Sequence, residues 1–209
     1  MNDRDAPSAK PDHQRPELPD FWDKRFDEGT TPWNAGGVPP ALQAFVAESP
    51  LAHTSVLVPG CGHAWEAAWL ATQGLQVTAL DFSAAAVEAA RTTLGEWRGD
   101  LVCADFFDYT PALPFALIYE RAFLCALPRK LWDGYGRRMH ELLAPGGRLA
   151  GFFFFSDEPK GPPFGIAPAA LDTLLEPWFV REVDAAVAAG DSIPVFAGKE
   201  RWQVWLRRD

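Results

Sequence analysis

The chain has 209 residues, with 19 basic and 28 acidic side chains and a formal net charge of −9 at pH 7. This length suits one α/β domain with a full hydrophobic core and is short for two such domains. The acidic balance, without any dense cluster of lysine and arginine, argues against nucleic acid and anionic lipid as partners.

No apolar run reaches the length that crosses a bilayer, and the most apolar stretch, 149–155, has the length of a strand. The first residues lack the apolar core of a secretory signal. Three cysteines, Cys61, Cys103 and Cys125, match no metal-binding or redox spacing. We therefore expect a cytoplasmic, monomeric protein with reduced thiols, no metal site and no membrane partner.

Residues 1–19 carry four prolines among charged side chains, a composition that buries too little apolar surface to order itself. We expect a flexible tail there and a single domain over 20–209. Within that domain, Phe21, Trp22 and Phe26 have helical spacing, with Asp20 as the expected N-cap and Gly29 as the terminator. A loop containing Trp33 and a helix over 41–48 should follow.

The most informative segment comes next. In order, it contains a β-type run at 55–58, a loop with Gly60 and Gly62, a helical stretch at 64–73, and a β-type run at 76–80 that ends on Asp81. Glycines allow a ligand to approach the backbone closely, and a helix start offers unpaired N–H groups. A carboxylate about 20 residues after such a loop can accept hydrogen bonds from ribose hydroxyls. This pattern predicts a nucleotide-binding βαβ unit.

Trp65 occupies the third glycine position of the dinucleotide-binding pattern. Close packing against a pyrophosphate is therefore disfavoured. S-adenosylmethionine, which has one ribose and no phosphate, demands less of this loop.

Further elements continue the alternation. We expect Ser83 to cap a helix at 84–94, then strands at 101–103 and 115–119, a helix at 129–143, a turn at 145–147, a strand at 148–155, a helix at 168–175, and strands at 179–183 and 202–206. The last two strands have no long helix between them. The sequence thus predicts a Rossmann-like, doubly wound α/β fold: a mostly parallel seven-stranded sheet, a C-terminal antiparallel hairpin and an N-terminal lid helix.

This order of elements resembles the class I S-adenosylmethionine-dependent methyltransferases, and within them the thiopurine S-methyltransferase family with its halide and thiol methyltransferase branch. The resemblance rests on Phe21-Trp22-Asp23-Lys24, on 57–62 (Leu-Val-Pro-Gly-Cys-Gly), on Asp105-Phe106-Phe107, on 120–126 (Glu-Arg-Ala-Phe-Leu-Cys-Ala), and on Gly161-Pro162-Pro163-Phe164. It covers the chain from about residue 20 to the C-terminus.

The resemblance implies a role for eight residues. Trp22 and Trp33 would cover the cofactor and substrate pocket, Gly60 and Gly62 would meet the cofactor's amino-acid end, Asp81 would hold the ribose, Asp105 and Phe106 would meet the adenine, and Arg121 would face cofactor and substrate. Thiopurine enzymes of the family usually carry Glu where this chain has Asp81, which leans toward the halide and thiol branch.

Structural roles remain open for the same residues. Asp81 could be a solvated turn carboxylate, the tryptophans could be core residues, and Arg121 could pair with Glu120, Asp105 or Asp108. Cys61 and His63 are interpreted as a packed residue and a surface or helix-start group, without catalytic roles.

Methyl transfer needs donor and acceptor aligned in a closed, dry pocket, and soft nucleophiles need no strong general base. The resemblance therefore indicates an S-adenosylmethionine-dependent methyltransferase that acts on a thiol, thiopurine, halide, or selenium or tellurium species. The aromatic residues Trp22 and Trp33 and the loop Pro162-Pro163-Phe164 would form its lid and wall. A non-catalytic S-adenosylmethionine sensor and an NAD(P)-dependent oxidoreductase stay open as alternatives.

Overall fold

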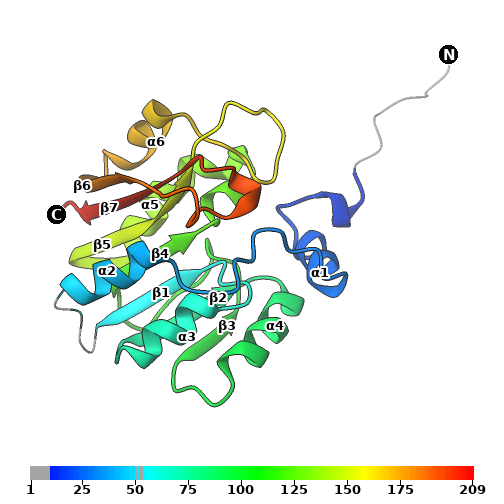
Figure 1. Ribbon diagram of the computed structural model, residues 1–209, viewed down its shortest axis with the longest axis horizontal. Helices are drawn as coiled ribbons and strands as arrows, with labels where there is room; N and C mark the ends of the chain where they lie inside the picture. The colour runs from blue at the N-terminus through cyan, green and yellow to red at the C-terminus, as the bar shows by residue number, and fades with distance from the viewer. Residues whose placement is uncertain (1–9, 50, 52–53) are drawn as a thin grey trace.

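The structure, a computed structural model, describes residues 10–49, 51 and 54–209. A seven-stranded sheet runs through it in the order β3-β2-β1-β4-β5-β7-β6 (Figure 1). Its strands are β1 (Ser55–Pro59), β2 (Gln76–Asp81), β3 (Asp100–Cys103), β4 (Phe115–Arg121), β5 (Leu143–Phe154), β6 (Phe179–Ala186) and β7 (Glu200–Arg207). Strands β1 to β5 pair in parallel, and β7 runs antiparallel to both β5 and β6. The predicted fold class is confirmed.

Helices cover both faces of the sheet. The α-helices are α1 (Pro19–Asp27), α2 (Pro40–Glu48), α3 (Trp65–Thr72), α4 (Ala84–Leu94), α5 (Trp132–Leu142) and α6 (Pro168–Leu175), and the short 3-10 turns are η1 (Asp12–Gln14), η2 (Leu124–Ala126), η3 (Arg129–Leu131) and η4 (Pro194–Phe196). Among the residues that the structure describes, no helix combines the length and apolar character needed to cross a membrane.

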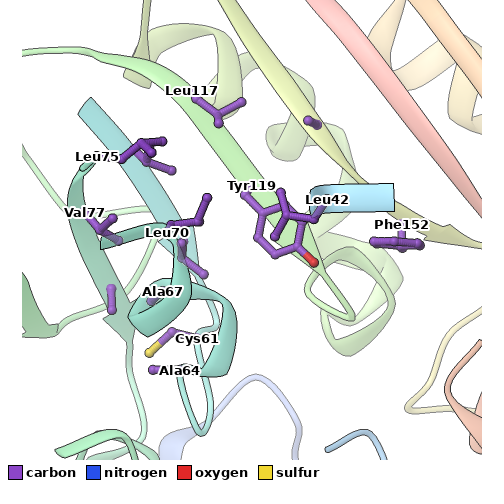
Figure 2. Packing of buried hydrophobic residues seen from close by; sticks show 14 of the residues in the cluster. Leu42, Cys61, Ala64, Ala67, Leu70, Leu75, Val77, Leu117, Tyr119 and Phe152 are labelled. Atoms are coloured by element: carbon purple, nitrogen blue, oxygen red, sulfur yellow. The ribbon is translucent and has the colours of Figure 1, made fainter. Parts of the chain in front are cut away.

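Two apolar clusters hold the layers together. On one face, Leu42 of α2 and Leu70 of α3 pack with Leu117 and Tyr119 of β4 (Figure 2). On the other face, α5 and α6 pack against the same strands, with Tyr135 of α5 fully buried. Burying a leucine side chain of this kind stabilises the fold by about 1.5–3 kcal/mol. These two clusters hold the central strands, whose carboxyl ends carry the site, between the helical layers.

Helix starts show one confirmed and one wrong prediction. Ser83 caps α4 as expected, because the Ala86 N–H donates to its Oγ at 3.0 Å. Asp20 is not the cap of α1: Leu18 is at the N-cap and Pro19 opens the helix. Proline fits the first helical position because its φ is preset and its missing N–H would have no helical partner.

The turn predicted at 145–147 lies inside a strand. Strand β5 already begins at Leu143, and its register against β4 shifts between the pairs Phe115–Leu143 and Leu117–Arg148. The Pro-Gly-Gly segment is therefore accommodated as an irregularity of the strand, which a local turn pattern does not distinguish from a free turn.

The segment before residue 20 makes contacts that its composition does not predict. Residues 1–9 of the predicted flexible tail lie outside the described residues. Residues 10–18 do contact the domain: the Trp22 indole donates to the Pro16 carbonyl at 2.9 Å, and the Lys130 ammonium donates to Glu17 at 2.6 Å. Pro16 and Glu17 therefore have partners within the domain, and the flexibility of the segment before residue 20 stays a prediction.

Candidate active site

A cavity of about 250 Å³ opens at the carboxyl ends of the central strands. Residues that follow β1, β2 and β4 form its floor, and α1 together with the loop after it forms one wall. The loops before α6 and before β7 contribute Pro162, Pro163, Val195 and Phe196. Figure 1 shows α1 and these two loops gathered at the same end of the sheet. All eight residues singled out from the sequence line this cavity.

The glycine loop is shaped for close approach. Gly60 and Gly62 have φ of +59° and +51°, a region that side-chain-bearing residues rarely adopt. A Cβ at Gly60 would also lie 2.5 Å from Cδ2 of Phe123. The Cys61 N–H donates to the Leu80 carbonyl at 3.0 Å, which ties this loop to the end of β2.

Asp81 ends β2 and joins the two halves of the predicted nucleotide unit. One carboxylate oxygen accepts from the Gly62 N–H and the other from the Ser83 N–H, each at 3.0 Å. Burial raises the pKa of Asp81 to about 6, although both N–H donors act in the opposite direction. The side chain is buried and lines the cavity, so the solvated-turn alternative is wrong.

Asp105 and Phe106 follow β3 on the neighbouring edge of the cavity. The Asp105 carboxylate accepts from the Phe107 N–H at 2.8 Å, which fixes the turn. The Phe106 ring is buried and meets the Phe123 ring edge to face, with centroids 5.0 Å apart. A polar acceptor and a flat apolar surface therefore lie next to each other here.

Trp22 and Trp33 form an aromatic wall. Their rings meet edge to face with centroids 5.4 Å apart, and Phe26 of α1 lies 6.2 Å from Trp33. The Trp65 indole donates to the Asn34 side chain at 3.0 Å, which connects the loop after α1 to the start of α3. Both predicted tryptophans thus face the cavity and are only partly buried.

Arg121 ends β4, and only 6% of its side chain is exposed. Its guanidinium lies between Glu66 of α3, at 3.9 Å, and Glu200 of β7, at 3.8 Å, and it donates to the Asp191 carbonyl at 3.0 Å. The sequence had suggested Glu120, Asp105 or Asp108 as the acidic partner of Arg121. Glu120 instead accepts from the backbone N–H groups of residues 123 and 124, at 2.9 and 3.4 Å, and burial raises its pKa to about 8.

Several lining residues were not found from the sequence. They are Arg25 and Phe26 of α1, Phe123 and Cys125 after β4, and Val195 and Phe196 before β7. Phe123 and Cys125 lie in a segment that the resemblance had already marked. The segment around Phe196 carries no recognisable motif, and only the fold brings it to the cavity.

The remaining candidates take structural positions. Pro162 and Pro163 line the cavity as expected, whereas Phe164 anchors their loop, since its N–H donates to the Cys125 carbonyl at 2.7 Å. Cys61 is buried and lies with His63 at a neighbouring hollow of about 60 Å³. Within 10–49, 51 and 54–209, no group of three or more His, Cys, Asp or Glu side chains could hold a metal ion.

A glycine loop after β1, an acid at the end of β2 and this strand order define the methyltransferase variant of the Rossmann-like fold. The fold matches 1,6-didemethyltoxoflavin-N1-methyltransferase from Burkholderia thailandensis, solved with bound S-adenosylhomocysteine, with a TM-score of 0.75 over 99% of this chain and 94% of that one at 20% identity. It also matches magnesium protoporphyrin IX methyltransferase from Synechocystis PCC 6803, solved with bound SAM, with a TM-score of 0.73 over 96% and 99% of the two chains at 16% identity.

The chain belongs to the thiopurine S-methyltransferase family, whose profile matches residues 18–208. It is 34% identical to a probable thiol methyltransferase 2 of Arabidopsis thaliana, over 75% of this chain and 71% of that one. It is 31% identical to thiocyanate methyltransferase 1 of Brassica oleracea (89% and 84%) and to thiopurine S-methyltransferase of Vibrio cholerae (90% and 96%). The predicted family, enzyme class and cofactor, S-adenosyl-L-methionine, are confirmed, and the oxidoreductase alternative is set aside.

Proposed function

We propose that this enzyme methylates a small sulfur nucleophile, a thiol or thiolate, in the cavity at the end of β1, β2 and β4. One observation carries the proposal. The buried Asp81 carboxylate lines that cavity and is hydrogen-bonded to the glycine loop, so the loop and the acid form one preorganised unit. The names of the plant and bacterial relatives support sulfur as the methyl acceptor.

The lining residues fit the cofactor. Asp81 would accept from the ribose hydroxyls with the lone pairs that its backbone bonds leave free, and Asp105 with Phe106 would take the adenine. Gly60 and Gly62 would lie against the amino-acid end. Trp22 and Trp33 would cover the sulfonium, because a cation near an aromatic face gains about 0.5–2 kcal/mol, depending on how far it is desolvated.

Bound S-adenosylmethionine supplies an activated methyl group for in-line displacement, in which a C–S bond forms to the acceptor while the sulfonium C–S bond breaks. The protein aligns the reactants and excludes water, an effect that reaches about 7–11 kcal/mol in well-oriented systems. Among the described residues that line the cavity there is no histidine. A thiol with an ordinary pKa near 8.5 is a few per cent thiolate at neutral pH, so a strong base is unnecessary.

Arg121 is the positioning residue that we propose for the acceptor side. Its cationic side chain lines the cavity, and it lies beneath the loop that carries Val195 and Phe196. A nearby positive charge favours the thiolate form of an acceptor. Glu66 and Glu200 hold the guanidinium in place and offset its charge, so Arg121 acts on the acceptor mainly through its position.

Two measurements test the function. Calorimetry should show that Asp81→Ala binds S-adenosylhomocysteine about 10- to 100-fold more weakly than the wild type, since charge-assisted hydrogen bonds are lost. Asp108→Ala is the matched control, because Asp108 is exposed and does not line the cavity.

Headspace chromatography should detect methylated products from alkanethiols. A wild type that binds S-adenosylhomocysteine but methylates no thiol, hydrosulfide, thiocyanate, iodide or selenium species would instead be a sensor.

We also propose that the enzyme works as a monomer in the cytoplasm. Its three cysteines are free thiols, with Cys61 and Cys125 buried and Cys103 exposed, as is typical of reducing compartments. Light scattering should give a mass near 23.0 kDa. A mass of twice that value would contradict the monomer.

A further inference from the structure

The loop between β6 and β7, residues 187–199, lines a part of the cavity to which we assign no cofactor-binding residue. It carries η4, and Val195 and Phe196 of that turn line the cavity. In Figure 1 this segment, drawn in orange, lies over the carboxyl end of the sheet near the loop that precedes α6. Its position makes it the wall against which an acceptor would rest.

The β6–β7 loop is fixed by buried hydrogen bonds. One Glu200 oxygen accepts from the Ser192 hydroxyl at 2.7 Å and from the Ile193 N–H at 2.8 Å, and Glu200 is only 3% exposed. Arg121 donates to the Asp191 carbonyl at 3.0 Å. The wall therefore does not simply yield to a larger ligand, since moving it would break bonds to buried polar groups.

Phe196 is the largest side chain of this wall. It is 2% exposed, its ring lies 4.9 Å from the Phe154 ring, and it forms a small apolar cluster with Cys125 and Ile193. Pro162 and Pro163, from the loop before α6, also line the cavity. The cavity lining that these two loops contribute, Pro162, Pro163, Val195 and Phe196, is therefore apolar.

Volume sets the limit on the acceptor. The whole cavity holds about 250 Å³, slightly below the ~300–1,000 Å³ usual for small-molecule sites. Under the proposed function, the cofactor and the acceptor share this one space. Resting on the proposed function, we propose that Phe196 is a specificity-determining residue that restricts the acceptor to compact alkanethiols and excludes thiols attached to a ring.

The test compares ethanethiol with cyclohexanethiol, two alkanethiols of similar acidity that differ in size. We measure kcat/KM for both from the release of S-adenosylhomocysteine. Phe196→Ala should raise the ratio of cyclohexanethiol to ethanethiol by about 10-fold or more, in line with discrimination by pocket size. Phe196→Leu, which keeps more of the packing, should raise it less and serves if the alanine variant fails to fold.

Phe45→Ala is the matched control. This substitution removes a ring of the same size from the contact between α2 and Trp202, and Phe45 does not line the cavity. The ratio of kcat/KM for cyclohexanethiol to that for ethanethiol should therefore stay at the wild-type value. An unchanged ratio in a folded Phe196 variant that still binds S-adenosylhomocysteine would overturn the inference alone. A wild type that binds S-adenosylhomocysteine but methylates neither thiol would overturn the inference. The proposed function falls as well only if the wild type also methylates no other thiol, hydrosulfide, thiocyanate, iodide or selenium species.

Discussion

The Asp81 carboxylate accepts two backbone hydrogen bonds and still faces the cavity. Its pKa, raised by burial to about 6, gives cofactor binding a pH dependence. Ribose hydroxyls donate to the carboxylate form, so affinity should rise as pH increases through about 6. Calorimetry should find S-adenosylhomocysteine bound about 10-fold more weakly at pH 5 than at pH 8. Asp81→Asn should flatten this profile, and an equally steep profile in the variant would assign the titration to another group.

Glu200 combines two functions in one side chain. One oxygen holds the β6–β7 loop, while the other lies 3.8 Å from Nε of Arg121, and neither of those two atoms has a hydrogen-bond partner among the described residues. Glu200→Gln keeps an acceptor for the loop but removes the charge. We expect it to lower the free energy of unfolding by about 1–3 kcal/mol, since Glu66 still faces Arg121.

The two functions of Glu200 can be distinguished by measuring the selectivity between the two thiols. Glu200→Gln should keep the wild-type ratio of kcat/KM for cyclohexanethiol and ethanethiol, because the loop stays anchored. Glu200→Ala releases Ser192 and Ile193 and should raise that ratio. Chemical denaturation and the same kinetic assay check both statements. Identical ratios in all three proteins would show that the loop needs no anchor at Glu200.

At the scale of elements, α1 is attached to the loop that follows β2. The Asp23 carboxylate accepts from the Ser83 hydroxyl at 2.6 Å and from the Ala85 N–H at 3.0 Å. Ser83 in turn donates through its backbone N–H to Asp81. The helix that carries Trp22 is thereby held to the residue that we propose for the ribose. A second contact, the ion pair between Lys130 and Glu17, lies just before α1. Because the Lys130 side chain is exposed, this ion pair contributes only about 0–1 kcal/mol to stability.

Asp23→Ala should therefore weaken S-adenosylhomocysteine binding about 10-fold and raise KM for S-adenosylmethionine, with a smaller change in kcat. Asp23→Asn retains a carbonyl acceptor and should restore most of the affinity. Asp27→Ala, an exposed position on the same helix, is the control. Calorimetry and steady-state kinetics give these values. Equal losses in the alanine and asparagine variants would contradict positioning through this hydrogen-bonded attachment.

For the whole molecule, Glu120 links pH to stability. Its buried carboxyl has a pKa raised to about 8, above its ordinary value of 4.5. A raised folded-state pKa contributes stability that is fully present below the ordinary value and is lost as pH rises through about 8. Glu120→Gln stays neutral and keeps an acceptor for the Phe123 N–H.

We expect Glu120→Gln to match the wild type near pH 5 and to exceed its free energy of unfolding by about 1–3 kcal/mol at pH 9. Urea denaturation at both pH values measures the difference between the two proteins, so that other titrating groups cancel. Parallel stability profiles for variant and wild type would show that Glu120 is already ionised in the folded protein at neutral pH.

Local patterns predicted much of the architecture. The helix at 84–94 and its Ser83 cap, and the helix at 168–175, appear with the predicted bounds, because spacing, capping and apolar runs act within a few residues. The predictions that were wrong depend on context. A turn pattern at 145–147 does not reveal that both flanks remain paired in one strand, and a polar side chain at Asp20 does not reveal that Pro19 already opens the helix.

The amino-acid sequence by itself determined the order of strands and helices along the chain, the glycine loop and the acid at the end of β2, since these follow from short-range spacing. The family was indicated by the resemblance of its motifs to known proteins. Only the tertiary structure decided which side chains surround Arg121 and which wall limits the acceptor. Glu66 and Glu200 reach Arg121, and Phe196 reaches the cavity, because separate elements converge at one end of the sheet. The two ion pairs of Arg121 span 55 and 79 residues of sequence, separations at which local patterns carry no information about distance.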